Sequence, residues 1–250
     1  IADAYRDGVA RGAAINYRKK NPETYETELV NALASGKGPD IFLLKDAWLE
    51  RHRDKINPLA DGANSYQKKN LKSIFADSIA DAIVTDAGAL VGTPLAFDTL
   101  ALFYNRDYFN SANVPNPPRT WEELAADVQV LTKQSEVGSI TRSGVALGTA
   151  VNVEHAADIF LALLYQGGGA VIDQAAGKSA LRNQATQSSL LFYTSFASPI
   201  KKTYAWNAFF ERSLTAFATG DAAMALGFAA DVPKVVALNP QLNFDVAPRP

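Results

Sequence analysis

Acidic, amide and aromatic side chains that could hold a small polar molecule follow four of the strands that the sequence predicts. In an open α/β sheet, ligands bind beyond the carboxyl ends of the strands, where loops converge and helix N-termini offer free N–H groups. The candidates that this rule selects are Lys45, Asp46, Trp48, Phe97, Asp98, Asn152, Glu154, His155, Phe228 and Asp231. The sequence thus predicts a site assembled from several loops.

Some of these side chains have a structural alternative. Trp48 suits packing as well as ligand contact, Asp98 suits a salt bridge or a cap, and His155 could cap the helix that follows it. Asp98 and Glu154 could also be the paired carboxylates of a glycosidase, one protonated and one ionised. That alternative requires a fixed distance between the two carboxyl groups.

Other catalytic and metal-binding patterns are missing from the sequence. His52 and His155 do not have the spacing of zinc ligands, cysteine is absent, and there is no G-x-S-x-G motif. The triple glycine at 167–169 lacks the lysine and hydroxyl residue of a phosphate loop, so it is interpreted as a helix terminator. We therefore expect no catalytic residues, no metal and no cofactor.

The charge balance argues against nucleic acid as a partner. The 250 residues include 24 basic and 26 acidic ones, for a formal net charge of −2, and neither sign forms a long run. No apolar stretch reaches the ~18 residues that a membrane span requires.

The elements that would position the candidate residues alternate between helix and strand. Helices are predicted over 24–35, 64–83, 120–128, 158–166, 184–196 and 210–217, and strands over 13–17, 41–44, 90–94, 100–105, 144–147, 222–227 and 244–247. This order predicts an α/β fold with mostly parallel sheets flanked by helices. The apolar run at 41–44 is typical of a strand buried on both faces.

Local signals mark several boundaries. Gly36 and Gly220 are expected to end helices, and Thr120 with Glu123 forms the pattern of a capping box, with Trp121 on the inner face of the helix. The segment 113–118, rich in proline and asparagine, reads as a linker and indicates two lobes.

Three segments together carry a family resemblance. They are YETELVNALASGKGPDIFLL at 25–44, the segment from TPLAFDTLALFYNRDYF through PNPPRTWEEL at 93–124, and AFATGDAAMAL at 216–226. In this order they resemble the family 1 extracellular solute-binding proteins of ABC importers, the family that includes maltose-binding protein.

The resemblance implies a two-lobed periplasmic-binding-protein fold of type II with a hinge between the lobes. Residues 1–104 would form the N-terminal lobe without its first strand, and residues 105–250 the C-terminal lobe up to the second hinge crossing. The family's opening strand would precede Ile1, and the rest of its chain would follow Pro250. Asp98 matches a position where an acidic side chain often accepts sugar hydroxyls, and Trp206 and Phe210 lie in a segment that can present an aromatic ring to the ligand. For Trp206, packing is the alternative to ligand contact.

The resemblance also implies a function. The protein would bind a mono- or oligosaccharide between its lobes, close around it, and deliver it to the membrane permease of an ABC importer. A monomer in the periplasm or at the cell surface, with or without a lipid anchor, is expected. The alternatives are a polyamine, a phosphorylated polyol or a metal chelate as ligand, or a surface sensor or adhesin that binds through its exterior.

Overall fold

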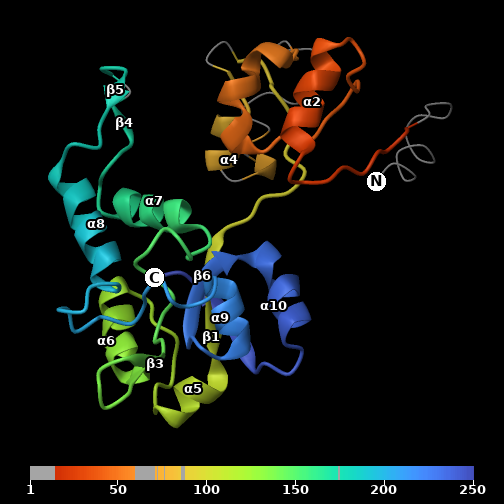
Figure 1. Cartoon of the computed structure of the whole chain (residues 1–250). Helices are drawn as coiled ribbons and strands as arrows, with labels where there is room; N and C mark the ends of the chain where they lie inside the picture. The colour runs from red at the N-terminus through yellow and green to blue at the C-terminus, as the bar shows by residue number, and fades with distance from the viewer. Residues whose placement is uncertain (1–14, 60–70, 72, 76, 86–87, 174) are drawn as a thin grey trace. The chain divides into compact units, whose positions relative to one another are not determined.

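The computed structural model of the chain describes residues 15–59, 71, 73–75, 77–85, 88–173 and 175–250 (Figure 1). The chain divides into two compact units, residues 1–96 and residues 97–250. The predicted linker 113–118 lies inside the second unit, between helices α5 (Arg106–Ser111) and α6 (Trp121–Leu131). The assignment of residues 1–104 and 105–250 to two lobes stays a prediction.

The described part of the first unit contains short helices. They are α2 (Tyr25–Ala34), the 3-10 helices η1 (Asp46–Trp48) and η2 (Glu50–Lys55), and α4 (Asp77–Ala82). Helix α2 confirms the helix predicted over 24–35, and Gly36 follows its end with a φ of +69°, a conformation that glycine adopts without steric cost. Part of the helix predicted over 64–83 lies outside the described residues.

The strands predicted for the first unit are not formed in its described part. Residues 41–44 have no regular structure, and Ile41 is 89% exposed, so the expectation of a strand buried on both faces is wrong. Among the described residues, no strand pairs with this segment, and an apolar sequence does not form a strand without a partner strand. Residues 15–17 are likewise irregular, while 13–14 lie outside the described residues. In place of a strand at 90–94, Leu90 makes isolated bridges to Leu59 and Val84.

The second unit is built on a three-stranded sheet in the order β6 (Met224–Phe228), β1 (Leu100–Asn105) and β7 (Phe244–Pro248). Strands β6 and β7 run in the same direction and are joined across helix α10 (Val232–Leu238), while β1 lies between them and is antiparallel to both. The expected mostly parallel pairing is therefore not found in the described ladders. Strand β1 lies between the two parallel strands β6 and β7 and pairs with each of them in the antiparallel direction. Parallel pairing occurs at two bridges, Ser143 with Ala222 and Ala146 with Ala225.

The remaining elements of the second unit surround this sheet. They are β2 (Lys133–Gln134), β3 (Ile140–Arg142), α7 (Ala156–Gln166), β4 (Ile172–Asp173), β5 (Lys178–Ser179), α8 (Gln184–Ser195), α9 (Ser213–Thr219) and the 3-10 helix η3 (Ala229–Asp231). In Figure 1, α9 lies beside β6 and α10 lies beside α9, and the β4–β5 hairpin projects beyond α8. None of the described helices combines the length and apolar character that a membrane crossing needs.

The helix boundaries of the second unit mostly follow the predicted signals. The Thr120 hydroxyl accepts the N–H of Glu123 at 3.2 Å, as predicted, but the Glu123 carboxylate accepts the N–H of Arg119 at 2.7 Å instead of closing the capping box on Thr120. Gly220 ends α9 with a φ of +89°. Helix α9 begins at Ser213, so Phe210 precedes the helix instead of lying on it.

Candidate functional site

Asn152 fixes one of the loops that carry the predicted site residues. Its Oδ1 accepts hydrogen bonds from Thr149 Oγ1 at 2.5 Å and from Trp206 Nε1 at 2.9 Å. Its Nδ2 donates to the carbonyl oxygens of Asn207 at 3.0 Å and Phe210 at 2.9 Å. Because two acceptor and two donor positions of this buried amide are occupied, Asn152 holds the segment 206–210 in place.

Trp206 is a core residue in the second unit. It is 0% exposed, and its ring stacks on that of Phe210 with centroids 4.5 Å apart and planes 10° apart. The expectation that Trp206 presents its ring to a ligand is not met in this structure, because the ring is covered and its N–H is bonded to Asn152. Phe210 remains half-buried, and Phe209 beside it is 99% exposed. Sequence reasoning missed Phe209, since two adjacent phenylalanines give no signal of which one faces outward.

Glu154 is bound on all sides by the protein. Its carboxylate is 7% exposed and accepts hydrogen bonds from the Ser213 hydroxyl at 2.8 Å and the Leu214 N–H at 3.0 Å, at the start of α9. The same carboxylate pairs with Arg212 Nε at 3.1 Å and Lys234 Nζ at 2.8 Å. Burial raises the pKa of Glu154, but these hydrogen bonds outweigh it and lower the pKa to about 2. Sequence reasoning missed Arg212 and Lys234, because their partner lies 58 and 80 residues away.

His155 joins the loop 152–155 to the segment after β6. Its Nε2 lies 2.9 Å from Asp231 Oδ2, which also accepts the N–H of Phe228 at 2.9 Å. The imidazole meets the Phe228 ring edge to face, with centroids 4.5 Å apart. His155 occupies the N-cap position of α7, but its side chain makes no capping hydrogen bond. The ring is committed to Asp231 and Phe228.

Asp98 ties the start of the second unit to η3. Its carboxylate accepts the backbone N–H groups of Ala229 at 3.0 Å, Ala230 at 2.9 Å and Thr99 at 2.8 Å. Burial acts to raise the pKa of Asp98. The hydrogen bonds from the N–H groups of Ala230, Thr99 and Ala229, together with the nearby His155, outweigh burial, so the pKa is lowered. Asp98 thus makes the contacts expected of a cap, and its contact with a ligand stays a prediction. Phe97, beside it, is 72% exposed.

The candidates of the first unit form a separate group. Asp46 is exposed and accepts the N–H of Ala47 at 2.8 Å. Trp48 is half-buried, and the Lys45 ammonium lies 5.0 Å from its ring centroid. Their contribution to a ligand site stays a prediction.

The second unit brings the remaining candidates together around residues 152–155. Asn152 contacts the aromatic segment 206–210, Glu154 contacts the start of α9, and His155 contacts the β6–η3 turn to which Asp98 is bound. The result is a set of loops cross-linked by hydrogen bonds, with the phenyl rings of Phe97 and Phe209 projecting from it. Protein partners occupy the polar side chains of these loops, while Phe97 and Phe209 are exposed.

The paired-carboxylate alternative is not supported by the electrostatics. A glycosidase needs one carboxyl group with a raised pKa, so that it stays protonated and can act as the general acid. The pKa values of both Asp98 and Glu154 are lowered. Among the described residues, no group of three or more His, Cys, Asp or Glu side chains is placed to hold a metal ion.

Solved structures show which class of protein has this fold. The cyclic α-maltosyl-1,6-maltose binding protein of Arthrobacter globiformis superposes with a TM-score of 0.75 at 19% identity, over 100% of this chain and 61% of that one. The UgpB protein of Mycobacterium tuberculosis, in complex with glycerophosphocholine, gives a TM-score of 0.72 at 21% identity, over 100% of this chain and 60% of that one. The fold is that of the two-lobed α/β solute-binding proteins of type II.

The chain belongs to the bacterial extracellular solute-binding protein family, whose model matches residues 11–250. Among curated relatives, the sn-glycerol-3-phosphate-binding periplasmic protein UgpB of Yersinia enterocolitica is 41% identical over 137 residues, 52% of this chain and 31% of that protein. The aligned region spans less than a third of the length of this relative, and the whole chain spans about 60% of the solved structures it resembles.

Proposed function

We propose that the protein is the extracytoplasmic solute-binding component of an ABC importer and that its ligand is a mono- or oligosaccharide. The observation that carries this proposal is the family match over residues 11–250. Structural relatives named as binding cyclic maltosyl-maltose, acarbose and maltotetraose support the carbohydrate. The permease of the importer would be the protein partner, and the ligand would be released unchanged.

Two exposed aromatic rings of the second unit support sugar as the ligand. Polar groups bridge sugar hydroxyls, and an aromatic face covers the C–H side of a pyranose ring. Phe97 and Phe209 are exposed on loops that Asp98 and Asn152 hold in place, so the rings are presented without ordering a loop on binding. Asp98 and Glu154 act in this proposal mainly as supports, since protein donors already occupy their carboxylates.

A phosphorylated polyol is the second candidate ligand. Curated relatives are named as sn-glycerol-3-phosphate-binding proteins, and one solved relative holds glycerophosphocholine. In this chain Arg212 uses its Nε to pair with Glu154, while its side chain stays 64% exposed. Its outer N–H groups could therefore form the bidentate contact that guanidinium makes with phosphate.

A thermal-shift screen separates the two candidates. The protein would be heated with mono- and oligosaccharides in one set and with sn-glycerol 3-phosphate and glycerophosphocholine in another. A ligand of the folded state adds about 2.7 kcal/mol of stability at a hundredfold excess over its dissociation constant. A saturable shift with one sugar supports the carbohydrate proposal, and a shift confined to the phosphate esters replaces it with the second candidate. No shift in either set contradicts both.

A further inference from the structure

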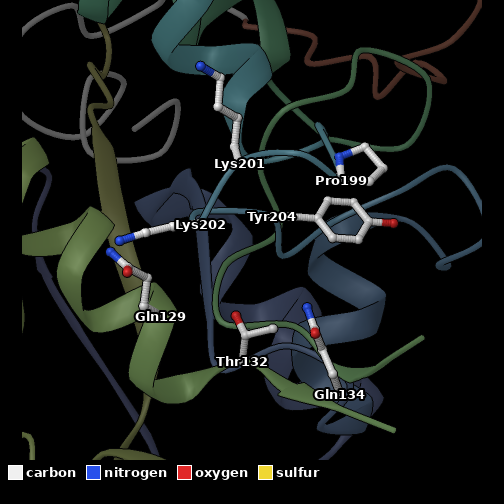
Figure 2. Close-up of a pocket in the computed structure, with 7 residues that line it drawn as sticks. All are labelled: Gln129, Thr132, Gln134, Pro199, Lys201, Lys202 and Tyr204. Carbon is white, nitrogen blue, oxygen red and sulfur yellow. The ribbon is translucent and has the colours of Figure 1, made fainter. Parts of the chain in front are cut away.

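A polar recess lies on the second unit, and none of its lining residues is a candidate site residue, although the loop that supplies residues 199–204 continues into the aromatic segment 206–210. Its volume is about 450 Å³, and it is lined by Gln129, Thr132, Gln134, Pro199, Lys201, Lys202 and Tyr204. Figure 2 shows that side chains from the end of α6 and from β2 face the loop of residues 199–204, which follows α8. A recess of this size can hold a small molecule, and its lining is more polar than that of a typical ligand pocket.

The charge of the recess is positive. Lys201 and Lys202 contribute two ammonium groups, and no carboxylate is among the lining residues. Within the part of the chain that the structure describes, neither lysine forms an ion pair, although the formal charge of the whole chain is −2. Both lysines are exposed and adjacent in the sequence, so their ammonium groups are accessible to an anion from outside.

The neutral lining groups add donors to these charges. The Tyr204 hydroxyl oxygen accepts a hydrogen bond from Asn207 Nδ2 at 3.3 Å, which leaves its hydrogen able to donate. Gln134 has no side-chain partner among the described residues, so its amide is also able to donate. In Figure 2 the Lys201 ammonium points away from the other lining groups, so its participation requires a change of rotamer, which the flexible stem of an exposed lysine permits.

We infer that the polar recess is a binding site for a small oxyanion, either a phosphate or the carboxylate of a compact organic acid. Two ammonium groups, a phenol and a side-chain amide supply the charge-assisted hydrogen bonds that such an anion needs. The inference does not depend on the proposed carbohydrate function, because the recess shares none of its lining residues with the candidate site.

Isothermal titration calorimetry tests this inference with inorganic phosphate in one arm and citrate in the other, at constant ionic strength set by sodium chloride. We expect saturable binding of at least one of the two anions, and the arm that responds identifies the class. The double variant Lys201→Gln and Lys202→Gln should weaken binding by about tenfold or more, because it removes both charged donors of the recess. Lys202→Arg should preserve binding.

Two control variants make the result specific. Lys178→Gln removes one positive charge from the exposed β4–β5 hairpin and should leave the affinity unchanged. Phe209→Ala should also leave it unchanged, which separates the recess from the proposed sugar site. The inference is overturned if neither anion binds saturably, if the double variant binds as tightly as the wild type, or if Lys178→Gln weakens binding equally.

Discussion

The Oδ2 atom of Asp98 lies 2.9 Å from the backbone nitrogen of Ala230, a residue 132 positions further along the chain. The other carboxylate oxygen accepts the N–H of Ala229, so one side chain satisfies the first two N–H groups of η3. Asp98 thereby fixes the turn that carries Phe228 and Asp231, two of the predicted site residues. This makes Asp98 a support of the candidate site.

Asp98→Ala should lower the free energy of unfolding by about 1 kcal/mol, the typical effect of losing a helix cap. Asp98→Asn should lose less, because its amide oxygen can still accept one of the N–H groups. Urea denaturation followed by tryptophan fluorescence measures both. Glu136→Ala, at an exposed acidic residue with no described partner, is the control and should not change stability. Equal stability of Asp98→Ala and the wild type would show that the cap is not formed.

Glu154 should make stability depend on pH in the acid range. Its folded-state pKa of about 2 lies below the value of 4.5 for the free side chain, so the stabilisation is present in full above pH 4.5 and disappears as the pH falls toward 2. The expected loss is on the order of 2 kcal/mol, with allowance for screening by solvent.

The matched variant for this prediction is Glu154→Gln, which keeps the shape and removes the titrating group. Urea denaturation of both proteins between pH 7 and pH 2.5 should give a stability difference that shrinks as the pH falls. A difference that stays constant over this range would contradict a paired, ionised Glu154.

Trp206→Ala should destabilise the second unit by about 3 kcal/mol or more, because it removes a fully buried ring and leaves Phe210 without its stacking partner. It also deprives Asn152 Oδ1 of a donor. Thermal unfolding measures the effect. If Trp206 were instead a ligand contact, the variant would keep its melting temperature and lose only affinity.

Phe209→Ala and Phe97→Ala should affect ligand affinity and leave stability nearly unchanged, in contrast to Trp206→Ala. Both rings are exposed, so removing either one should change the melting temperature little, while affinity for the ligand found in the screen should fall by about tenfold. Val137→Ala is the control, because Val137 is an exposed apolar residue in the turn between β2 and β3. Unchanged affinity in both phenylalanine variants would remove these rings from the site.

The sequence predicted those parts of the fold that depend on local signals. The cap at Thr120, the glycine after α9 and the apolar strand β1 act within a few residues, so each was predicted near its observed place. The run at 41–44 failed because a strand needs a partner, and local hydrophobicity does not say whether one is present. The antiparallel placement of β1 was missed for the same reason, since the order of strands is set by contacts between distant segments.

In the candidate site, too, local sequence signals did not reveal contacts between distant segments. Residues 98, 152–155 and 228–231 do contact one another, but only 228–231 lies at the end of a described strand, β6, while the predicted strands 90–94 and 144–147 are reduced to isolated bridges at Leu90 and Ala146. The strand-end rule could not assign roles within these loops. Whether Asp98, Glu154 and Trp206 face outward depends on partners between 54 and 132 residues away, such as Asn152 for Trp206 and Ala230 for Asp98.

The most direct test of the central claim is an isothermal titration of the purified protein with the sugar that gives the largest thermal shift. A solute receptor should show a single saturable site with one ligand per chain, no change in the sugar recovered afterwards, and weaker binding by Phe209→Ala but not by Val137→Ala. Absence of binding heat with every sugar and phosphate ester, in a sample whose circular dichroism shows a folded α/β protein, would contradict the assignment as a solute receptor.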